Sequence, residues 1–451
     1  MYTGLNLGPL KDSMAGVVDG QPTDPIGAVD QTGRTVLQGG KVVDPKNGID
    51  GVKDIAFVGD TITEVADEIK GENGDRLIDC SGLLVVPGLV DMHVHQCDLF
   101  EVSTRPVFES ARDGVTMGLS PGAGNTLMAP ALLGAEIDRG VPVNLGVYIG
   151  AGNALCTMLS RDELIQLFKG ELDPTVGSRR MTRNMITLLT APLTIGIKDH
   201  MGHFIMSDED IDAAFEVTSE AQLVYMSHTQ DPEHTERIVG LSDGRPIHLA
   251  HMTAAGCGTH GDGVDGMKRV VELVKGEHVW GEFVTTQLRP GPGSRERLQM
   301  TEASQQVAYE ALERGLVDIL ISDGQNHATM TGFGDTRDNI PYLLELPEIG
   351  VLSLSEAVAS MTCNPAALLA KRTGNPWWAK AIGHLGAGAL TNVTVIDEDD
   401  KLATMTLVNG QLAAFDNRVV RRGNGAGGWV SKYGMVKRTG IGDLVTHSFQ
   451  G

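Results

Sequence analysis

The sequence predicts an α/β protein, a (β/α)8 TIM barrel joined to a small discontinuous β-sandwich domain built from both chain ends. Three observations support this fold class. Short apolar runs alternate with longer amphipathic stretches through the middle of the chain, which is typical of βα units around a parallel sheet. Short alternating runs broken by turn residues occur near both ends. The length of 451 residues suits one large barrel with a smaller companion domain.

The β domain is expected in residues 1–84 and 385–451, with an irregular arm at each end of the chain. Its first part contains two alternating runs with turn residues between them, which predict a small antiparallel sheet. Its second part contains Asn409-Gly410, a strong signal for a hairpin. The two parts are expected to form one domain, with the barrel in residues 85–384 between them.

Eight apolar runs are the predicted barrel strands, and eight strand–helix units favour a closed barrel over an open sheet. These runs are 88–95, 114–120, 141–150, 192–198, 221–228, 245–251, 278–284 and 317–323. The clearest helices between them are expected at 208–220, 231–242 and 300–315. The long gap between 150 and 192 predicts an extra lobe over the barrel mouth. Residues 352–372 are expected to form a helix that leads back to the β domain.

Composition excludes several classes of protein. The chain has 58 acidic and 36 basic residues, a net charge of −22, which would repel nucleic acid and an anionic membrane. No apolar run reaches the roughly 18 residues that span a bilayer, and the N-terminus does not resemble a signal peptide. The five cysteines form no CxxC pair, so neither a disulfide framework nor a thiolate zinc site is indicated. A cytoplasmic protein is expected.

Metal-binding residue types stand at the ends of five predicted strands. They are His93 and His95, Lys198, His228, His251 and Asp323. Enzymes built on this barrel place catalytic groups at the C-terminal ends of the strands. One histidine alone is more often a structural residue than a ligand, but five such placements together favour a metal site at the barrel mouth.

Alternation along the strands supports the same site, because residues two apart in a strand point the same way. His93 and His95 can therefore reach one metal ion. By the same rule, three strand-end residues are expected to share a face with the apolar residues two and four positions earlier: His228 with Met226 and Val224, His251 with Leu249 and Ile247, and Asp323 with Ile321 and Ile319.

Lys198 follows an apolar strand, where an unpaired ammonium group would be costly. In one interpretation it forms an ion pair with Asp199 or Asp323. In the other, its amine reacts with CO₂ to form a carbamate, an anion able to bridge two divalent ions. Burial favours the neutral amine that this reaction requires.

These residues resemble the binuclear branch of the amidohydrolase superfamily, which includes hydantoinases, dihydroorotases and isoaspartyl dipeptidase. PGLVDMHVH (87–95) is similar to the family's first strand, and ISDG (321–324) to its eighth. SHTQDPEH (227–234) and RPIHLAHMTAAG (245–256) resemble elements of hydantoinases and dihydroorotases, and the second of these elements selects His251 over His248. IGIKDH (195–200) resembles the lysine strand of isoaspartyl dipeptidase.

The resemblance implies two divalent metal ions, with zinc the first choice and Mn, Fe, Co or Ni as alternatives. His93, His95 and Asp323 would bind one ion, and His228 and His251 the other. Carboxylated Lys198 and a hydroxide would bridge the two. The hydroxide would attack the substrate carbonyl, and Asp323 would carry its proton to the leaving nitrogen. Such families also imply a homo-oligomer, a dimer or tetramer.

Two positions depart from the family pattern. His203 stands where hydantoinases carry a tyrosine that polarises the substrate carbonyl, and Gln230 replaces a glutamate. His203 or His200 is a candidate for the missing electrophile, with structural packing an equal alternative. The candidate contacts with a small-molecule amide substrate follow the strands: Asn125, Asn153, Arg289, Gln325, Asn326 and His327.

The expected activity is hydrolysis of a C–N bond in a cyclic amide or ureide. A linear amide hydrolase, either a dipeptidase or an N-acyl amino acid deacylase, is the first alternative. Deaminases rank lower because they usually lack the bridging lysine. A non-catalytic binding protein similar to dihydropyrimidinase also stays open.

Overall fold

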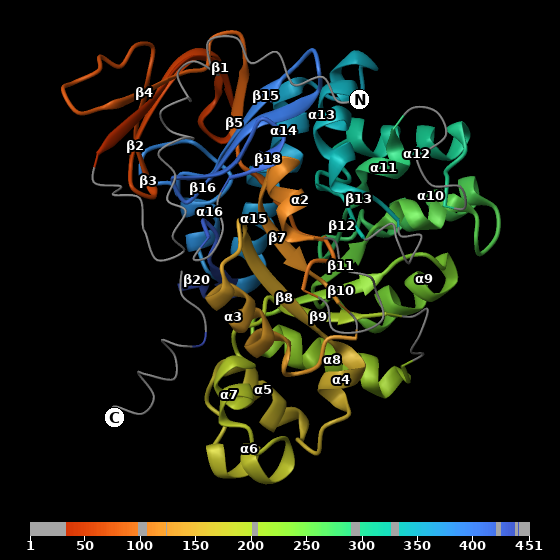
Figure 1. The fold of residues 1–451 in the computed structure, drawn as a ribbon. Helices are drawn as coiled ribbons and strands as arrows, with labels where there is room; N and C mark the ends of the chain where they lie inside the picture. The colour runs from red at the N-terminus through yellow and green to blue at the C-terminus, as the bar shows by residue number, and fades with distance from the viewer. Residues whose placement is uncertain are drawn as a thin grey trace.

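The computed structural model describes residues 33–97, 106–122, 124–200, 206–289, 298–325, 333–420, 425–437 and 441. Figure 1 shows a barrel of strands in the middle of the molecule, with helices around it. A second sheet lies beside the barrel, where red and orange strands from the start of the chain meet blue strands from its end. A helical lobe extends away from the barrel on the opposite side.

Eight strand positions make up the barrel, as the sequence predicts. Each strand pairs in parallel with the next along the chain. The seventh position is split into two short pieces at Glu282. The strands are β6 (Leu89–Asp91), β7 (Val115–Ser120), β8 (Asn144–Gly150), β9 (Gly196–Asp199), β10 (Val224–His228), β11 (Ile247–Ala250), β12 (Val279–Gly281) with β13 (Phe283–Val284), and β14 (Leu320–Ile321).

Contacts beyond the ends of β6 and β14 close the ring. The Asp323 backbone N–H donates to the His93 carbonyl oxygen over 2.9 Å, and the His95 N–H donates to the Gly324 carbonyl oxygen over 3.0 Å. Val94 and Gly324 also form a parallel bridge. The first and last strands are therefore neighbours, although more than 200 residues of chain separate them.

Helices cover the outside of the barrel, and three of them match the expected positions closely. These three are α8 (Asp208–Glu220), α9 (Pro232–Leu241) and α12 (Glu302–Glu313). The others are α2 (Val107–Arg112), α3 (Ala129–Arg139), α10 (Gly263–Leu273), α11 (Thr285–Leu288) and α13 (Asn339–Glu348). Ser207 and Thr301 cap α8 and α12 by accepting a backbone N–H with their hydroxyl oxygens. No described helix is long and apolar enough to cross a membrane.

The single helix expected at 352–372 is wrong. The chain forms α14 (Leu354–Ser360) and α15 (Cys363–Thr373), because Thr362 has a non-helical backbone conformation. A third helix, α16 (Trp377–Ala381), follows. Side chains of α15 and α16 share a core with inward-facing barrel residues such as Met226 and Ile321, so these helices pack against the barrel.

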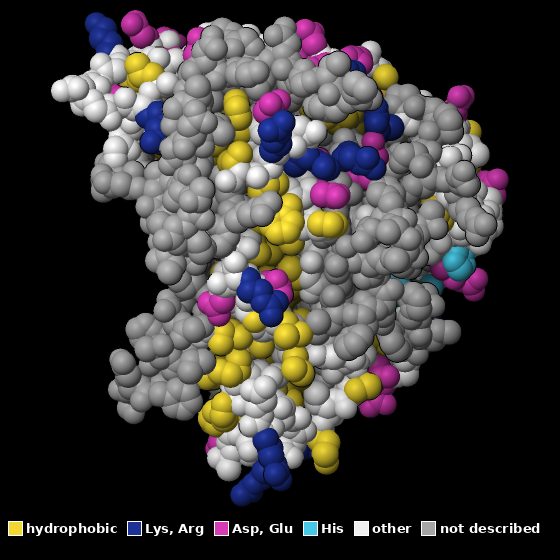
Figure 2. Space-filling model, viewed as in Figure 1, with side chains coloured by type: hydrophobic (Ala, Val, Ile, Leu, Met, Phe, Trp, Pro, Cys, Tyr) yellow, Lys and Arg dark blue, Asp and Glu magenta, His cyan; other side chains and the backbone are white. Residues whose placement is uncertain are grey.

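The long gap after β8 folds into a helical lobe, as expected, while its expected place over the barrel mouth stays a prediction. It contains α4 (Ala151–Leu155), α5 (Arg161–Lys169), α6 (Pro174–Arg180) and α7 (Met185–Thr190). Ser160 and Glu163 form a reciprocal capping box at the start of α5. The lobe packs on α3 and α8 of the outer helix layer. Figure 2 shows apolar side chains gathered on this part of the surface, and Met158 is 71% exposed there.

Strands from both chain ends form one nine-stranded sheet. The N-terminal ones are β1 (Arg34–Asp44), β2 (Ile49–Val58), β3 (Thr61–Ala66), β4 (Arg76–Asp79) and β5 (Leu84–Pro87). The C-terminal ones are β15 (Val393–Asp397), β16 (Leu402–Val408), β17 (Gln411–Phe415) and β18 (Arg418–Val419). The two sets join where β5 pairs with β15. The first part is not purely antiparallel as expected, because β1 pairs in parallel with β4 and β5.

The predicted hairpin at Asn409-Gly410 is confirmed. It joins β16 to the antiparallel β17, and both turn residues have positive φ, which suits the twist of a two-residue hairpin. The Asn409 side chain then donates to the buried Asn144 Oδ1 over 2.7 Å. The Gly428 N–H donates to the same oxygen over 2.9 Å. Asn144 therefore ties the barrel to the second sheet and to β19 (Trp429–Ser431), which pairs with β8 and with β20 (Gly434–Lys437).

We expect Asn144→Ala to lower the free energy of unfolding by about 2–4 kcal/mol, because it leaves the buried Gly428 N–H without this acceptor and removes one of the two acceptors of the Asn409 amide. The measurement is denaturant unfolding followed by circular dichroism. Asn364→Ala, which removes a bond to the Asp318 carbonyl oxygen and a weak contact with the Cys363 thiol at a half-buried position, is the control and should cost about 1 kcal/mol or less. An equal decrease in the free energy of unfolding in the two variants would contradict the linking role of Asn144.

Candidate metal centre

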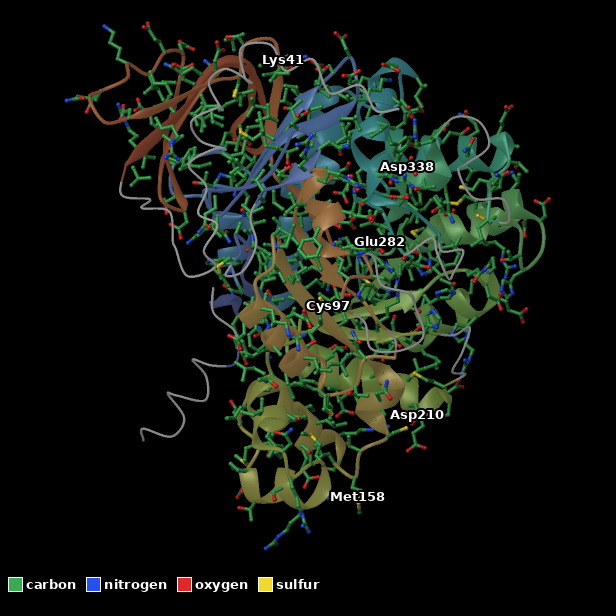
Figure 3. The ribbon with its side chains drawn as sticks, viewed as in Figure 1. Lys41, Cys97, Met158, Asp210, Glu282 and Asp338 are labelled. Carbon is green, nitrogen blue, oxygen red and sulfur yellow. The ribbon has the colours of Figure 1, made fainter. Side chains whose placement is uncertain are left out.

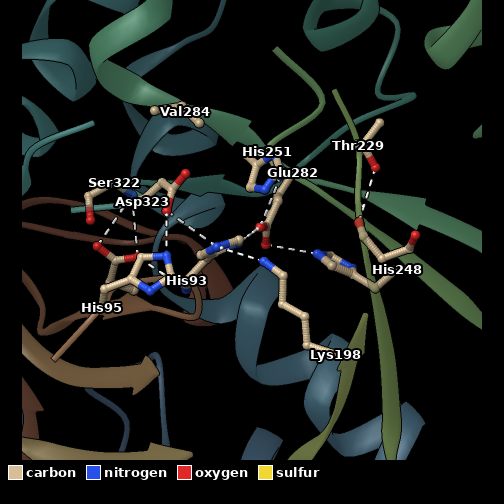
Figure 4. A network of polar contacts seen from close by, with 12 residues as sticks. His93, His95, Lys198, Thr229, His248, His251, Glu282, Val284, Ser322 and Asp323 are labelled. Carbon is tan, nitrogen blue, oxygen red and sulfur yellow. Dashed lines mark hydrogen bonds and ion pairs between the residues drawn. The ribbon is translucent and has the colours of Figure 1, made fainter. Parts of the chain in front are cut away.

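Closure of the barrel brings three predicted ligands together at one end of the strands. His95 Nε2 lies 3.0 Å from Asp323 Oδ1, and His93 Nε2 lies 3.3 Å from the same oxygen. All three side chains are buried. Figure 4 shows the two imidazoles and the carboxylate converging on one another.

Lys198 reaches the same cluster from β9. Its Nζ lies 3.1 Å from His93 Nε2, and the residue is 1% exposed. Burial, with a further contribution from Lys198, lowers the pKa of His93 well below its ordinary value. His93 is therefore held as the neutral imidazole that binds metals.

The His251 side chain points into the cluster because of its backbone conformation, and not because of strand alternation as expected. Ile247 and Leu249 lie in the apolar layer between strands and helices, whereas His248 and Ala250 face the barrel interior. The expectation that His251 shares a face with Ile247 and Leu249 is therefore wrong. The His251 backbone is left-handed, with φ of 36°, and this turns its side chain inward. Its ring centre lies 5.1 Å from that of His93.

Asp323 also has a left-handed backbone, with φ of 47°. Non-glycine residues rarely adopt this conformation, and where they do they concentrate at functional sites. Two of the six predicted ligands thus occupy strained positions within two residues of the end of a barrel strand.

His228 extends the row of imidazoles. Its ring centre lies 4.5 Å from that of His251 and 4.7 Å from that of His200. The Gln230 side-chain oxygen accepts from His228 Nε2 over 3.2 Å, and its amide nitrogen donates to the Thr259 hydroxyl over 2.9 Å. Phe333 covers the row from one side, with its ring centre 4.7 Å from that of His251. The imidazoles are thus partly shielded from solvent.

Two buried carboxylates below the cluster fix the strand ends. Asp91 accepts from the backbone N–H groups of Ser322 and His93, and so links the last strand to the first. Asp199 accepts from the Tyr225 hydroxyl over 2.8 Å and from the His228 N–H over 3.2 Å. Burial raises the pKa of Asp91 to about 7 and that of Asp199 to about 6. The sequence reasoning assigned neither of these roles.

Glu282 is the main residue of the centre that the sequence reasoning missed. It is fully buried between β12 and β13, and its carboxylate contacts His93 Nδ1 and lies 2.8 Å from His248 Nε2. An acidic residue inside the apolar run HVWGEFV was the available signal, because a buried charge needs partners. Figure 3 shows Glu282 in the middle of the molecule, far from Met158 at the tip of the lobe.

The donor set fits a divalent metal ion. His93, His251 and Asp323 each offer one ligand atom, and these atoms lie within 4.8 Å of one another. Within the described part of the chain, His251 Nδ1 and Asp323 Oδ2 are buried with no hydrogen-bond partner. Buried polar atoms without partners are costly, and a metal held by imidazole and carboxylate ligands would satisfy such atoms. These residues form a candidate metal site.

The predicted substrate contacts are in varied positions. Gln325 is buried beside Asp323, with its amide nitrogen 3.5 Å from Asp323 Oδ1. Asn125 donates to the Tyr148 carbonyl oxygen, and Asn153 on α4 donates to the Asn125 carbonyl oxygen. Arg289 forms ion pairs with two carboxylates of the helix layer, those of Asp338 at 2.7 Å and Glu345 at 2.6 Å. His203, Asn326 and His327 lie outside the described residues.

Comparison with known proteins finds sequence relatives and structures of similar fold among hydrolases. A dihydroorotase of Trichlorobacter lovleyi is 24% identical over 401 residues, covering 80% of this chain and 89% of that protein. The structure of a dihydropyrimidinase from Brevibacillus agri NCHU1002 superimposes with a TM-score of 0.66 at 16% identity, covering 90% of this chain and all of the other.

A β-aspartyl dipeptidase from Fervidobacterium islandicum AW-1, solved in complex with a β-Asp-Leu dipeptide, gives a TM-score of 0.61 at 15% identity. It covers 87% of this chain and 98% of the other. At these identities the two structures establish the shared barrel fold. The model of the amidohydrolase family matches residues 84–412, which is most of the chain. The protein therefore belongs to the amidohydrolase family.

Proposed function

We propose that this protein is a metal-dependent hydrolase that opens a C–N bond of a small cyclic amide or ureide. The observation that carries the proposal is the convergence of buried imidazoles, a lysine and a carboxylate where the barrel closes. The dihydroorotases and the dihydropyrimidinase to which the chain is similar support a cyclic substrate.

The proposed site holds two divalent ions, with zinc the first choice and Mn, Fe, Co or Ni as alternatives. His93, His95 and Asp323 would hold one ion. His228 and His251 would hold the other, and a carboxylated Lys198 would lie between them. The 3.1 Å separation of Lys198 Nζ and His93 Nε2 supports a role for the lysine at the shared ligand position.

The chemistry that bound divalent ions supply is a hydroxide nucleophile at neutral pH and polarisation of the scissile carbonyl. Asp323 is placed to take the proton of the nucleophile, because its Oδ2 has no hydrogen-bond partner within the described residues. The same carboxylate then delivers the proton to the leaving nitrogen.

Phe333 restricts water access beside His228 and His251. Gln325, next to Asp323, is the described side chain best placed to hold the substrate amide.

We expect Asp323→Asn to lower kcat by about 10²–10⁴-fold, because an amide cannot carry the proton. The measurement is steady-state hydrolysis, with metal content determined on the same sample. Asp75→Asn, which breaks a peripheral ion pair with Arg34, is the control and should keep wild-type kcat. An Asp323→Asn enzyme with near wild-type turnover would remove Asp323 from the proton-transfer role.

If Lys198 is carboxylated, then zinc uptake by metal-free protein should depend on CO₂. We expect reconstitution in CO₂-free buffer to be slow and incomplete, and added bicarbonate to restore both zinc content and activity. Lys198→Met should bind less zinc and show no response to bicarbonate. Full reconstitution of the wild type without CO₂ would show that Lys198 acts as a plain amine.

A substrate panel tests the reaction class. The expected result is turnover of a dihydropyrimidine, a hydantoin or dihydroorotate, with much weaker cleavage of β-aspartyl dipeptides and N-acyl amino acids. A clear preference for the linear amides would move the assignment to a dipeptidase or deacylase. No turnover of either group by protein with full metal content would contradict the proposed reaction class.

A further inference from the structure

We propose that Glu282 is a positioning residue, which with His248 fixes the His93 imidazole for metal binding. This inference rests on the proposed metal centre and adds to it a carboxylate that is not among the six predicted ligands. Glu282 comes from the seventh strand position, His248 from the sixth and His93 from the first, so the three span one side of the barrel interior (Figure 4).

The contacts of Glu282 are divided between its two carboxylate oxygens. Oε1 contacts His93 Nδ1 and accepts the His251 backbone N–H over 3.2 Å. Oε2 lies 2.8 Å from His248 Nε2. Glu282 is completely buried, so these contacts replace the water that the charge would otherwise require. One carboxylate thereby holds both His93 and the backbone at His251, which belong to the two proposed metal positions.

The contact at Nδ1 decides how His93 can act. When Nδ1–H donates to Glu282, the proton is fixed there and Nε2 keeps its lone pair. Nε2 is the atom that faces Lys198 Nζ and Asp323 Oδ1, at 3.1 and 3.3 Å. A carboxylate behind an imidazole ligand also raises its basicity, and losing such a partner typically costs about 10–100-fold in metal affinity.

His248 explains how the carboxylate is kept in place. It is 1% exposed, and among the described residues its Nδ1 has no hydrogen-bond partner, so the contact with Glu282 is its one side-chain hydrogen bond there. A fully buried carboxylate held by a single imidazole could rotate toward the metal and become a ligand itself. Because Oε1 contacts His93 and Oε2 contacts His248, both carboxylate oxygens are held away from the metal position.

The test compares three variants by zinc affinity, measured in competition with a chromophoric chelator. Glu282→Gln keeps the shape but must donate its amide N–H to one of the two imidazoles, and it loses the charge. His248→Asn leaves the Glu282–His93 contact intact. The control is Asp54→Asn, because Asp54 is also buried and accepts two backbone N–H groups, but lies in the second sheet.

We expect zinc affinity to fall about 10–100-fold in Glu282→Gln, only a few-fold in His248→Asn, and not at all in Asp54→Asn. The unfolding midpoints of the metal-free proteins separate this effect from general destabilisation, which should appear in Asp54→Asn without loss of zinc. At saturating zinc, the kcat of Glu282→Gln should rise toward the wild-type value. Its KM should change little, because the substrate contacts are intact.

Zinc affinity of Glu282→Gln within twofold of wild type would overturn the proposal. So would a loss in Glu282→Gln with no change at all in His248→Asn, which would indicate that Glu282 binds the metal directly. If the wild-type chain itself binds no zinc, the proposed metal centre fails, and that result is distinct from a failure of the Glu282 assignment.

Discussion

The closure of the barrel between its first and last strands is the contact on which the candidate centre depends. Two backbone hydrogen bonds, from Asp323 to His93 and from His95 to Gly324, fix the register of this closure. A shift of one residue would turn either the two histidines or the aspartate away from the mouth. Asp91 reinforces the register from below, since it accepts N–H groups from both strands. The same arrangement that completes the fold therefore assembles half of the proposed ligands.

The closed barrel mouth concentrates polar groups that an apolar interior would not tolerate alone. His93, His251 and Asp323 are buried with ligand atoms within 4.8 Å of one another, and the buried Lys198 and Glu282 both contact His93. Such a cluster is stable when each group has a partner, and costly when one is missing. Metal ions would be the partners of the imidazole and carboxylate groups at the barrel mouth. Deeper in the barrel, the Glu282 carboxylate and the His248 imidazole are partners of each other. Folding stability and metal affinity are thus expected to be coupled in this protein.

Much of the fold could be predicted because the signals are local. The apolar runs placed the barrel strands, the amphipathic stretch at 208–220 matched α8, and Asn409-Gly410 marked its hairpin. The features that were missed depend on tertiary contacts or on single dihedral angles. The parallel pairing of β1 with β4 and β5, and the break at Thr362, have no clear local signature.

The candidate centre shows the same division. The positions of His93, His95 and His228 follow from strand ends and alternation, and that of Asp323 from its place near the end of the last strand. The inward direction of His251 does not, because it results from a left-handed backbone that strand alternation cannot foresee. Glu282 is visible in the sequence as an acidic residue in an apolar run, but its partners appear only when strands one, six and seven are brought together.

Metal content per chain is the measurement that tests the central claim most directly. The protein would be purified without chelator, in the presence of bicarbonate, and analysed by elemental mass spectrometry. We expect close to two divalent ions per folded chain. About one ion would contradict the bridged pair and leave Lys198 as a plain amine. No metal in folded protein would contradict hydrolysis as the function and favour a binding role.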